Sequence, residues 1–266
     1  MNVMEGDLAD LYRVPRTGSR SGSRSRDALV KLPRDPRDSD LIEREAVALR
    51  QLPKDGDGRY LPYVPRLFES FEHRDPATGE RRTANAMSAL DGFHSLAEVR
   101  AAHPGGLDPR DAAWMWRRLL VGLGFAHRAV VLHGAVLPEH VLIHPGKHGV
   151  VLVDWCYSVP GCYARVDSSG RVPAMVNRYA DWYPPEVPGR WQASAATDIY
   201  MATRCMTYLM GDQAPKPLSM FAKGCLLSAQ NRRPNDAWRL LGELDEVLEG
   251  LYGPRRFRPF SMPTPR

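Results

Sequence analysis

The stretch that decides the fold is His133-Gly134-Ala135-Val136-Leu137-Pro138-Glu139-His140-Val141-Leu142, followed by the apolar run 150–153 and then by Asp154. Val141–Ile143 and 150–153 have the short apolar pattern of β-strands, and the Pro- and Gly-containing segment between them predicts a turn. Together they predict a β-hairpin. Asp154 follows the second strand directly. Because an unpaired carboxylate is costly to bury, an Asp at this place is rarely a simple core residue.

Composition limits the class of protein. The chain has 266 residues, of which 43% are hydrophobic and 25% charged, as expected for a globular protein of one large or two-lobed domain. We expect neither a membrane span nor a signal peptide, because long apolar runs are missing and the N-terminus is polar and acidic. The four cysteines lack C-x-x-C spacing, so neither a zinc site nor a redox pair is indicated, and a reduced, cytoplasmic setting is expected.

The net charge of +5 is concentrated in two segments. Residues 18–26 read GSRSGSRSR, and the Pro-rich tail 254–266 carries four arginines. Such segments can bind nucleic-acid phosphates. Because nothing apolar is present to fold them, we favour solvated segments and do not expect a nucleic-acid partner.

The order of elements predicts an α+β protein. Strands are expected at Ala28–Leu32, 63–71 and 83–90, the last two as a hairpin, with a helix from Ser39 or Asp40 to about Leu52. The second part is mainly helical, with helices at 109–131, 194–210 and 235–251. Residues 155–191 lack clear periodicity and predict a long ordered loop, which is usually functional.

From about Gly6 to Tyr252 the sequence resembles the protein-kinase superfamily. Lys31 ends Ala-Leu-Val-Lys, similar to the V-A-I-K strand whose lysine holds the α- and β-phosphates of ATP. Glu45, fourteen residues later, is similar to the helix glutamate that pairs with this lysine, and Glu43 is the competing candidate. Taken alone, Lys31 is most simply a surface lysine and Glu45 an ordinary helix glutamate. The resemblance favours the functional roles for both.

The opening stretch is similar to the catalytic loop H-R-D-x-x-x-x-N, and Asp154-Trp155-Cys156 to D-F-G. His133 then matches the structural histidine, and Asp154 the ligand of the Mg²⁺ that accompanies ATP. Ala135 stands where kinases have the proton-accepting Asp, and His140 where they have the Asn that binds the second metal ion. Because magnesium prefers oxygen ligands, we expect His140 to be structural rather than a ligand.

Later motifs support the fold more than they support catalysis. Tyr183-Pro184-Pro185-Glu186 is similar to A-P-E, Asp198 matches the aspartate that braces the catalytic loop, and Arg233 matches the late arginine that pairs with Glu186. The resemblance implies a bilobal kinase-like fold with a small β-rich N-lobe at 1–90, a mainly helical C-lobe at 91–253 and the basic tail 254–266.

The glycine-rich loop departs most from the family pattern. Segment 4–12 keeps one glycine, Gly6, aligned with the second of G-x-G-x-x-G, and Met4 and Ala9 stand at the other two positions. Side chains there would block the approach of phosphates, and Asp7 and Asp10 would repel them. We also expect an abbreviated first strand or a true start upstream of Met1.

These departures favour a pseudokinase that binds Mg-ATP weakly or for regulation and signals through a protein partner. An active atypical serine/threonine kinase, with Glu139 or His140 as the base, is the alternative. A nucleotide-free interaction platform using 179–191 is a third hypothesis. Candidate phosphoacceptors are Ser158, Ser168 and Ser169. The catalytic-loop string also looks like bacterial and phage kinase-like proteins labelled DnaJ-type chaperones, but the His-Pro-Asp of a J-domain is missing.

Overall fold

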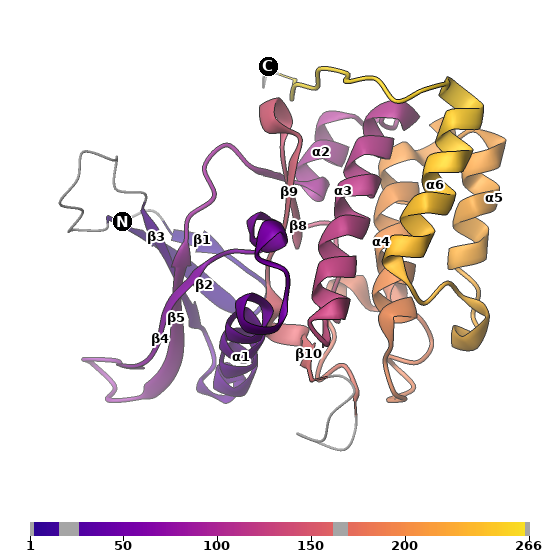
Figure 1. The fold of residues 1–266 in the computed structure, drawn as a ribbon. Helices are drawn as coiled ribbons and strands as arrows, with labels where there is room; N and C mark the ends of the chain where they lie inside the picture. Colours follow the sequence, from indigo (N-terminus) through magenta and orange to yellow (C-terminus); the bar gives the residue numbers. More distant parts are fainter. Residues whose placement is uncertain (1–2, 16–26, 162–169, 264–266) are drawn as a thin grey trace.

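The computed structural model describes residues 3–15, 27–161 and 170–263, and Figure 1 shows two parts with different architecture. The first part is an antiparallel sheet with strand order β1-β2-β3-β5-β4. Its strands are β1 (Val3–Glu5), β2 (Ala9–Val14), β3 (Ala28–Pro33), β4 (Leu67–Arg74) and β5 (Arg81–Ser88). The predicted hairpin of β4 and β5 is present, with a register shift between Leu67 and Glu69.

Helix α1 (Ser39–Asp55) packs against this sheet and carries one functional side chain on its buried face. Leu41, Ile42, Leu49 and Leu52 bury the stripe that the sequence predicts, and Glu45 lies within the same stripe. The helix begins at Ser39, where we expect it. The amphipathic pattern therefore orients Glu45 toward the interior.

The second part is mainly helical and is built around α3. Its helices are α2 (Leu96–Ala102), α3 (Pro109–Arg128), α4 (Ala195–Met210), α5 (Lys216–Cys225) and α6 (Ala237–Tyr252). Helix α3 is buried along most of its length, with Trp116, Leu119 and Leu123 in the core, and it packs against both α4 and α6. Helices α2 and α5 were not predicted, because each is too short to give a clear periodic pattern.

The predicted hairpin of the deciding stretch is present as β8 (Val141–His144) and β9 (Gly149–Leu152), with β6 (His94–Ser95) beside β8. Strands β7 (Val131–Leu132) and β10 (Val159–Pro160) form a second small pair. Between 155 and 191 the described residues contain this β10 strand and 3₁₀ turns at 155–157 and 177–182. The end of this hairpin places Asp154 against Lys31 on β3 of the first part, at 2.8 Å.

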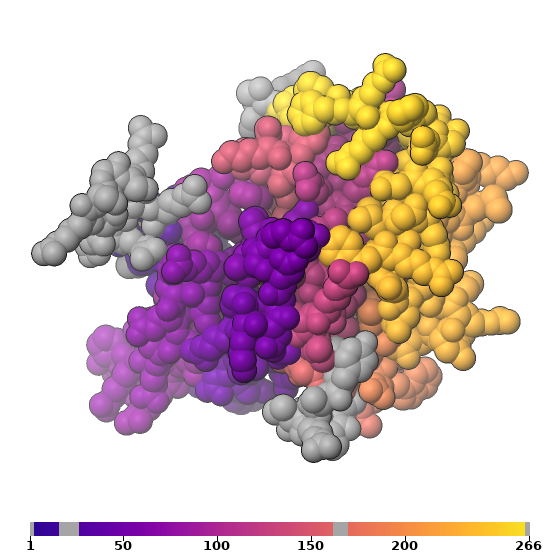
Figure 2. Space-filling view, viewed as in Figure 1, coloured from indigo at the N-terminus to yellow at the C-terminus, as the bar shows by residue number. Residues whose placement is uncertain are grey.

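The C-terminal segment lies on the helical part, where Figure 2 shows it in yellow along the upper edge. Arg258 forms ion pairs with Asp108 at 3.1 Å and Asp111 at 2.9 Å, and Phe260 packs near Trp114. Most of residues 254–263 are exposed, as we expect, but Arg258, Phe260 and Met262 of this segment pack against the helical part. The basic segment 18–26 lies outside the described residues. Within the described part of the chain, every helix is too short or too polar to span a membrane.

Candidate functional site

Lys31 is the centre of a buried charge cluster between the two parts of the molecule. Its ammonium lies 3.2 Å from Glu45 Oε1, 2.8 Å from Asp154 Oδ1 and 3.1 Å from Cys156 Sγ. Burial alone would lower the pKa of Lys31, but the nearby carboxylates of Asp154 and Glu45 outweigh it and raise this pKa well above its ordinary value. Lys31 is therefore charged, and the structure joins three sequence-predicted residues: Lys31, Glu45 and Asp154.

Glu45, rather than Glu43, meets the lysine. Asn85 donates a hydrogen bond to Glu45 Oε2 at 3.0 Å, and the backbone N–H of Trp155 donates to Oε1 at 3.2 Å. Glu43 instead accepts a hydrogen bond from the Thr83 hydroxyl near the surface. Both oxygens of the buried Glu45 carboxylate therefore have partners, which removes most of the cost of burying its charge.

Asp154 lies just beyond β9 in a left-handed backbone conformation, with φ of 63°. Aspartate tolerates this region better than most residues, and such positions are common at functional sites. Burial would raise the pKa of Asp154, but Lys31 and His140 hold it well below its usual range. The turn directs one carboxylate oxygen to Lys31 and the other toward His140, at 2.8 and 3.5 Å.

The side chain of Asp198 on α4 holds the backbone of the catalytic-loop stretch. Its carboxylate accepts hydrogen bonds from the backbone N–H groups of His133 at 2.8 Å and Gly134 at 2.9 Å. Gly134 has a φ of +77°, and a Cβ there would lie 2.1 Å from the carbonyl oxygen of Tyr157, so only glycine fits. His133 donates from Nε2 to the carbonyl of Val153 at 3.0 Å, which ties the loop to the strand leading to Asp154.

Ala135 follows directly and is fully buried, so it presents only a methyl group where a kinase base would stand. Its carbonyl oxygen instead accepts a hydrogen bond from Nδ1 of His140 at 2.8 Å. The loop backbone therefore holds Nδ1 of His140.

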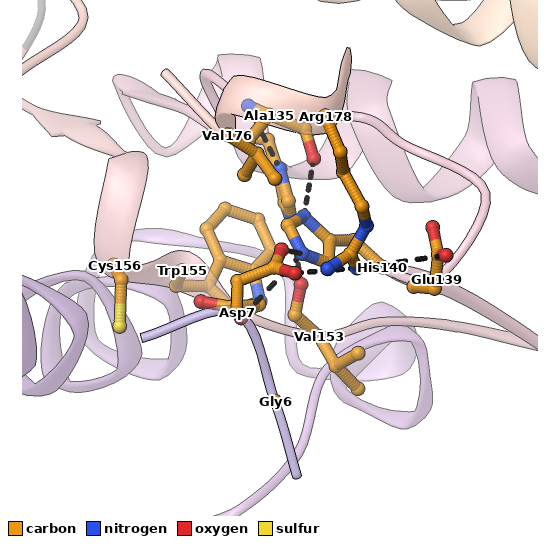
Figure 3. Close-up of polar contacts among 12 residues, drawn as sticks. Gly6, Asp7, Ala135, Glu139, His140, Val153, Trp155, Cys156, Val176 and Arg178 are labelled. Carbon is orange, nitrogen blue, oxygen red and sulfur yellow. Dashed lines mark hydrogen bonds and ion pairs between the residues drawn. The ribbon is translucent and has the colours of Figure 1, made fainter. Parts of the chain in front are cut away.

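The main feature that the sequence did not predict is the position of Asp7. Figure 3 shows its carboxylate, from the turn between β1 and β2, directed at His140 and Arg178. Asp7 Oδ2 accepts from His140 Nε2 at 2.9 Å, and Oδ1 pairs with the guanidinium of Arg178. The Asp7 side chain is only 5% exposed, so it is buried where the two parts of the molecule meet, a region that we call the cleft.

The contact changes the state of His140. Burial would lower the pKa of His140, but the carboxylates of Asp154 and Asp7 raise it above the ordinary value. Because both ring nitrogens face acceptor oxygens, the ring donates two hydrogen bonds and carries a positive charge. Arg178 also lies 3.5 Å from Glu139, so both alternative bases suggested by the sequence are already paired with charged neighbours.

Gly6 precedes Asp7 and forms the tight part of the turn. Its N–H donates to the carbonyl of Ala9 at 2.9 Å, and a Cβ at Gly6 would lie 3.0 Å from that oxygen. Asp10 points elsewhere and pairs with Arg34 at 3.0 Å. We expect both aspartates to repel phosphate, but of the two only Asp7 directs its carboxylate into the cleft.

The later motifs form a buried support under the site. Arg233 pairs with both oxygens of Glu186 at 2.7 and 2.6 Å, and Thr197 donates to Glu186 at 2.8 Å. The predicted pairing is thus present. Among the proposed phosphoacceptors, Ser158 is fully buried, whereas Ser168 and Ser169 lie outside the described residues.

Sequence reasoning missed Arg178 and Cys156 as well as the direction of Asp7. Cys156 occupies the place of the D-F-G glycine, and burial raises the pKa of its thiol well above the ordinary value, so the neutral thiol faces Lys31. The only sequence signal for Asp7 was its place in the degraded glycine loop. Arg178 gave none, because it belongs to a segment without periodicity.

Comparisons with known proteins agree with this geometry at the level of the fold. No model of a known protein family matches the sequence, and no curated protein matches it. Among many matching solved structures is the crystal structure of a mutant PknI kinase domain from Mycobacterium tuberculosis, with a TM-score of 0.65 and 15% identity over 92% of each chain. The chain is therefore an α+β protein with the two-lobed fold of the protein kinases.

Proposed function

We propose that this protein is a pseudokinase, a kinase-fold module that signals by its conformation through a protein partner. The observation that carries the proposal is the chemistry around Ala135. Its methyl group cannot accept a proton, both ring nitrogens of His140 already face acceptor oxygens, and Glu139 is paired with Arg178. General-base help is worth roughly 10²–10⁴ in rate, so phosphoryl transfer is expected to be impaired or absent.

Weak or regulatory Mg-ATP binding is part of the proposal. Lys31 and Asp154 are the groups that would hold the phosphates and one magnesium ion, and both are buried in the cleft in ionised form. They fit that role once the Lys31–Asp154 pair opens. Asp7 opposes phosphate binding, because its carboxylate already pairs with His140 and Arg178. A phosphate group must displace this carboxylate before it can pair with the same two groups.

A cytoplasmic location also belongs to the proposal. Cys156, Cys205 and Cys225 are buried free thiols, which suits a reducing compartment. The partner is proposed to be a protein because the chain retains the groups that organise the fold, including Glu186, Asp198 and Arg233, while it lacks the base.

An active atypical serine/threonine kinase is the second candidate. The observation in its favour is the complete Lys31–Glu45–Asp154 cluster, since phosphoryl transfer depends mainly on positioning and charge neutralisation.

Two measurements on the same samples test the proposal. In thermal unfolding, millimolar Mg-ATP should raise the melting temperature of the wild type. The increase should be smaller in Asp154→Asn. Transfer of radiolabelled phosphate from ATP by the wild type should not exceed the transfer measured with Asp154→Asn. Transfer by the wild type above that level would support the active kinase instead. The absence of ATP stabilisation would overturn the nucleotide-binding part and favour a nucleotide-free platform.

A further inference from the structure

Three side chains from distant parts of the chain direct potential metal-ligand atoms at one point in the cleft. They are Asp7 from the β1–β2 turn, His140 before β8 and Asp154 after β9, and one ligand atom from each lies within 4.8 Å of the others. We propose that Asp7, His140 and Asp154 form a binding site for one divalent transition-metal ion of the zinc class. This site does not depend on nucleotide binding.

The two carboxylates are oriented by their outer oxygens. Arg178 holds Oδ1 of Asp7, and Lys31 holds Oδ1 of Asp154 at 2.8 Å. The Oδ2 atom of each carboxylate faces His140. Nε2 of His140 lies 2.9 Å from Oδ2 of Asp7 and 3.5 Å from Oδ2 of Asp154. Ligand atoms about 2.0–2.1 Å from a tetrahedral zinc ion are about 3.3 Å apart, so the two observed separations bracket that value.

His140 is oriented in the way that metal-binding histidines usually are. Its Nδ1–H donates to the carbonyl of Ala135 at 2.8 Å, which fixes the ring and leaves Nε2 facing the two carboxylates. In the metal-free protein the Nε2 proton lies between them. A metal ion takes the place of that proton, which passes to solvent, and the two carboxylates neutralise the ion.

The ligand set selects the metal. Imidazole nitrogen with two carboxylates suits zinc and neighbouring transition metals, whereas magnesium prefers oxygen ligands. The second magnesium of kinases therefore does not fit here, because its Asn position is His140. A competing cluster of Glu45, Asp154 and Cys156 is less suited, since the ammonium of Lys31 already lies 2.8 to 3.2 Å from each of these groups.

Calorimetric titration of the full chain, stripped of metal with a chelator and free of nucleotide, tests the site. We expect one zinc ion per chain in the wild type. Asp7→Asn and His140→Asn should each weaken zinc binding at least tenfold, and His140→Asn should shift preference toward magnesium by supplying an amide oxygen. His73→Asn, on strand β4 away from the cleft, controls for zinc held by surface histidines and should bind as the wild type does.

Cobalt(II) supplies a second readout. The visible absorption of bound cobalt should show nitrogen ligation in the wild type and lose it in His140→Asn, with circular dichroism confirming that each variant is folded. Zinc affinity unchanged in both Asp7→Asn and His140→Asn, or equal binding of magnesium and zinc by the wild type, would overturn the site. Mg-ATP binding is measured separately, so failure of the pseudokinase proposal leaves this result interpretable.

Discussion

At the scale of single residues, the state of each charged group in the cleft is set by its neighbours. Lys31 and Asp154 would each lose charge if buried alone, yet together they remain ionised. His140 becomes cationic beside two carboxylates, and this cation lies at a position where kinases hold a metal ion with Asn. The cationic groups Lys31, His140 and Arg178 are thus paired with the carboxylates of Asp154 and Asp7.

His133 shows the opposite behaviour and gives a pH prediction. Its complete burial lowers the pKa from 6.5 to about 4, despite attraction from Asp198. The unfolded chain therefore binds a proton between about pH 6.5 and 4 that the folded chain does not, and stability falls as pH falls through this window. The loss for this group is roughly 3 kcal/mol. Urea unfolding at several pH values measures the slope.

The matched variant is His133→Gln, whose amide can still donate to the carbonyl of Val153. It should unfold with a smaller loss of free energy between pH 6.5 and 4 than the wild type shows. Equal slopes in the two proteins would contradict a neutral, buried His133. The slope is the readout because the substitution itself also changes packing.

At the scale of elements, close packing of α3 against α6 depends on a glycine. A Cβ at Gly124 would lie 2.5 Å from Nε1 of Trp238, which is closer than packed atoms approach. Trp238 in turn lies against Tyr60, with ring centroids 5.2 Å apart, and beneath the guanidinium of Arg128. The indole is therefore held on several sides and cannot move without disturbing its neighbours.

We expect Gly124→Ala to destabilise the protein by about 1–3 kcal/mol through overpacking, although alanine is the better helix former. Gly242→Ala in α6 is the matched control, since a Cβ there meets nothing within 4 Å. It should stabilise by about 0.5–1 kcal/mol. Chemical denaturation of both variants measures the difference, and a stabilising Gly124→Ala would show that Trp238 adjusts freely.

At the scale of the whole molecule, Asp7 joins the sheet-containing lobe to the helical lobe. It belongs to the β1–β2 turn, and its partners His140 and Arg178 belong to the other lobe (Figure 3). The Lys31–Asp154 contact crosses the same boundary at 2.8 Å. The relative position of the lobes therefore depends on charge pairs that an anionic ligand or a metal ion can rearrange.

Removal of the Asp7 carboxylate should release the turn. In metal-free buffer, we expect backbone amides of residues 6–9 to exchange hydrogen at least about tenfold faster in Asp7→Ala than in the wild type, as local opening becomes easier. Glu5→Ala is the matched control in the same hairpin, because Glu5 at the end of β1 is exposed. Similar exchange in both variants would mean that the Asp7 contacts do not hold the turn.

Much of the fold was predictable because its signals are local. The apolar stripe of α1, the β8–β9 hairpin and the motif order around Lys31, Glu45 and Asp154 can all be recognised in short windows. Helices α2 and α5 escaped prediction because they are short. The contacts of Arg258 in the tail were not predicted, because its partners, Asp108 and Asp111, lie far away in the sequence.

The sequence by itself determined the kinase-like order of motifs and the substitution at Ala135, since both depend only on which residue stands at which place. Only the tertiary structure decided that Asp7 enters the cleft and that His140 is a cation between two carboxylates. A pairwise interaction between residues 133 positions apart leaves no local pattern, and the charge of an imidazole depends on the groups that folding brings around it.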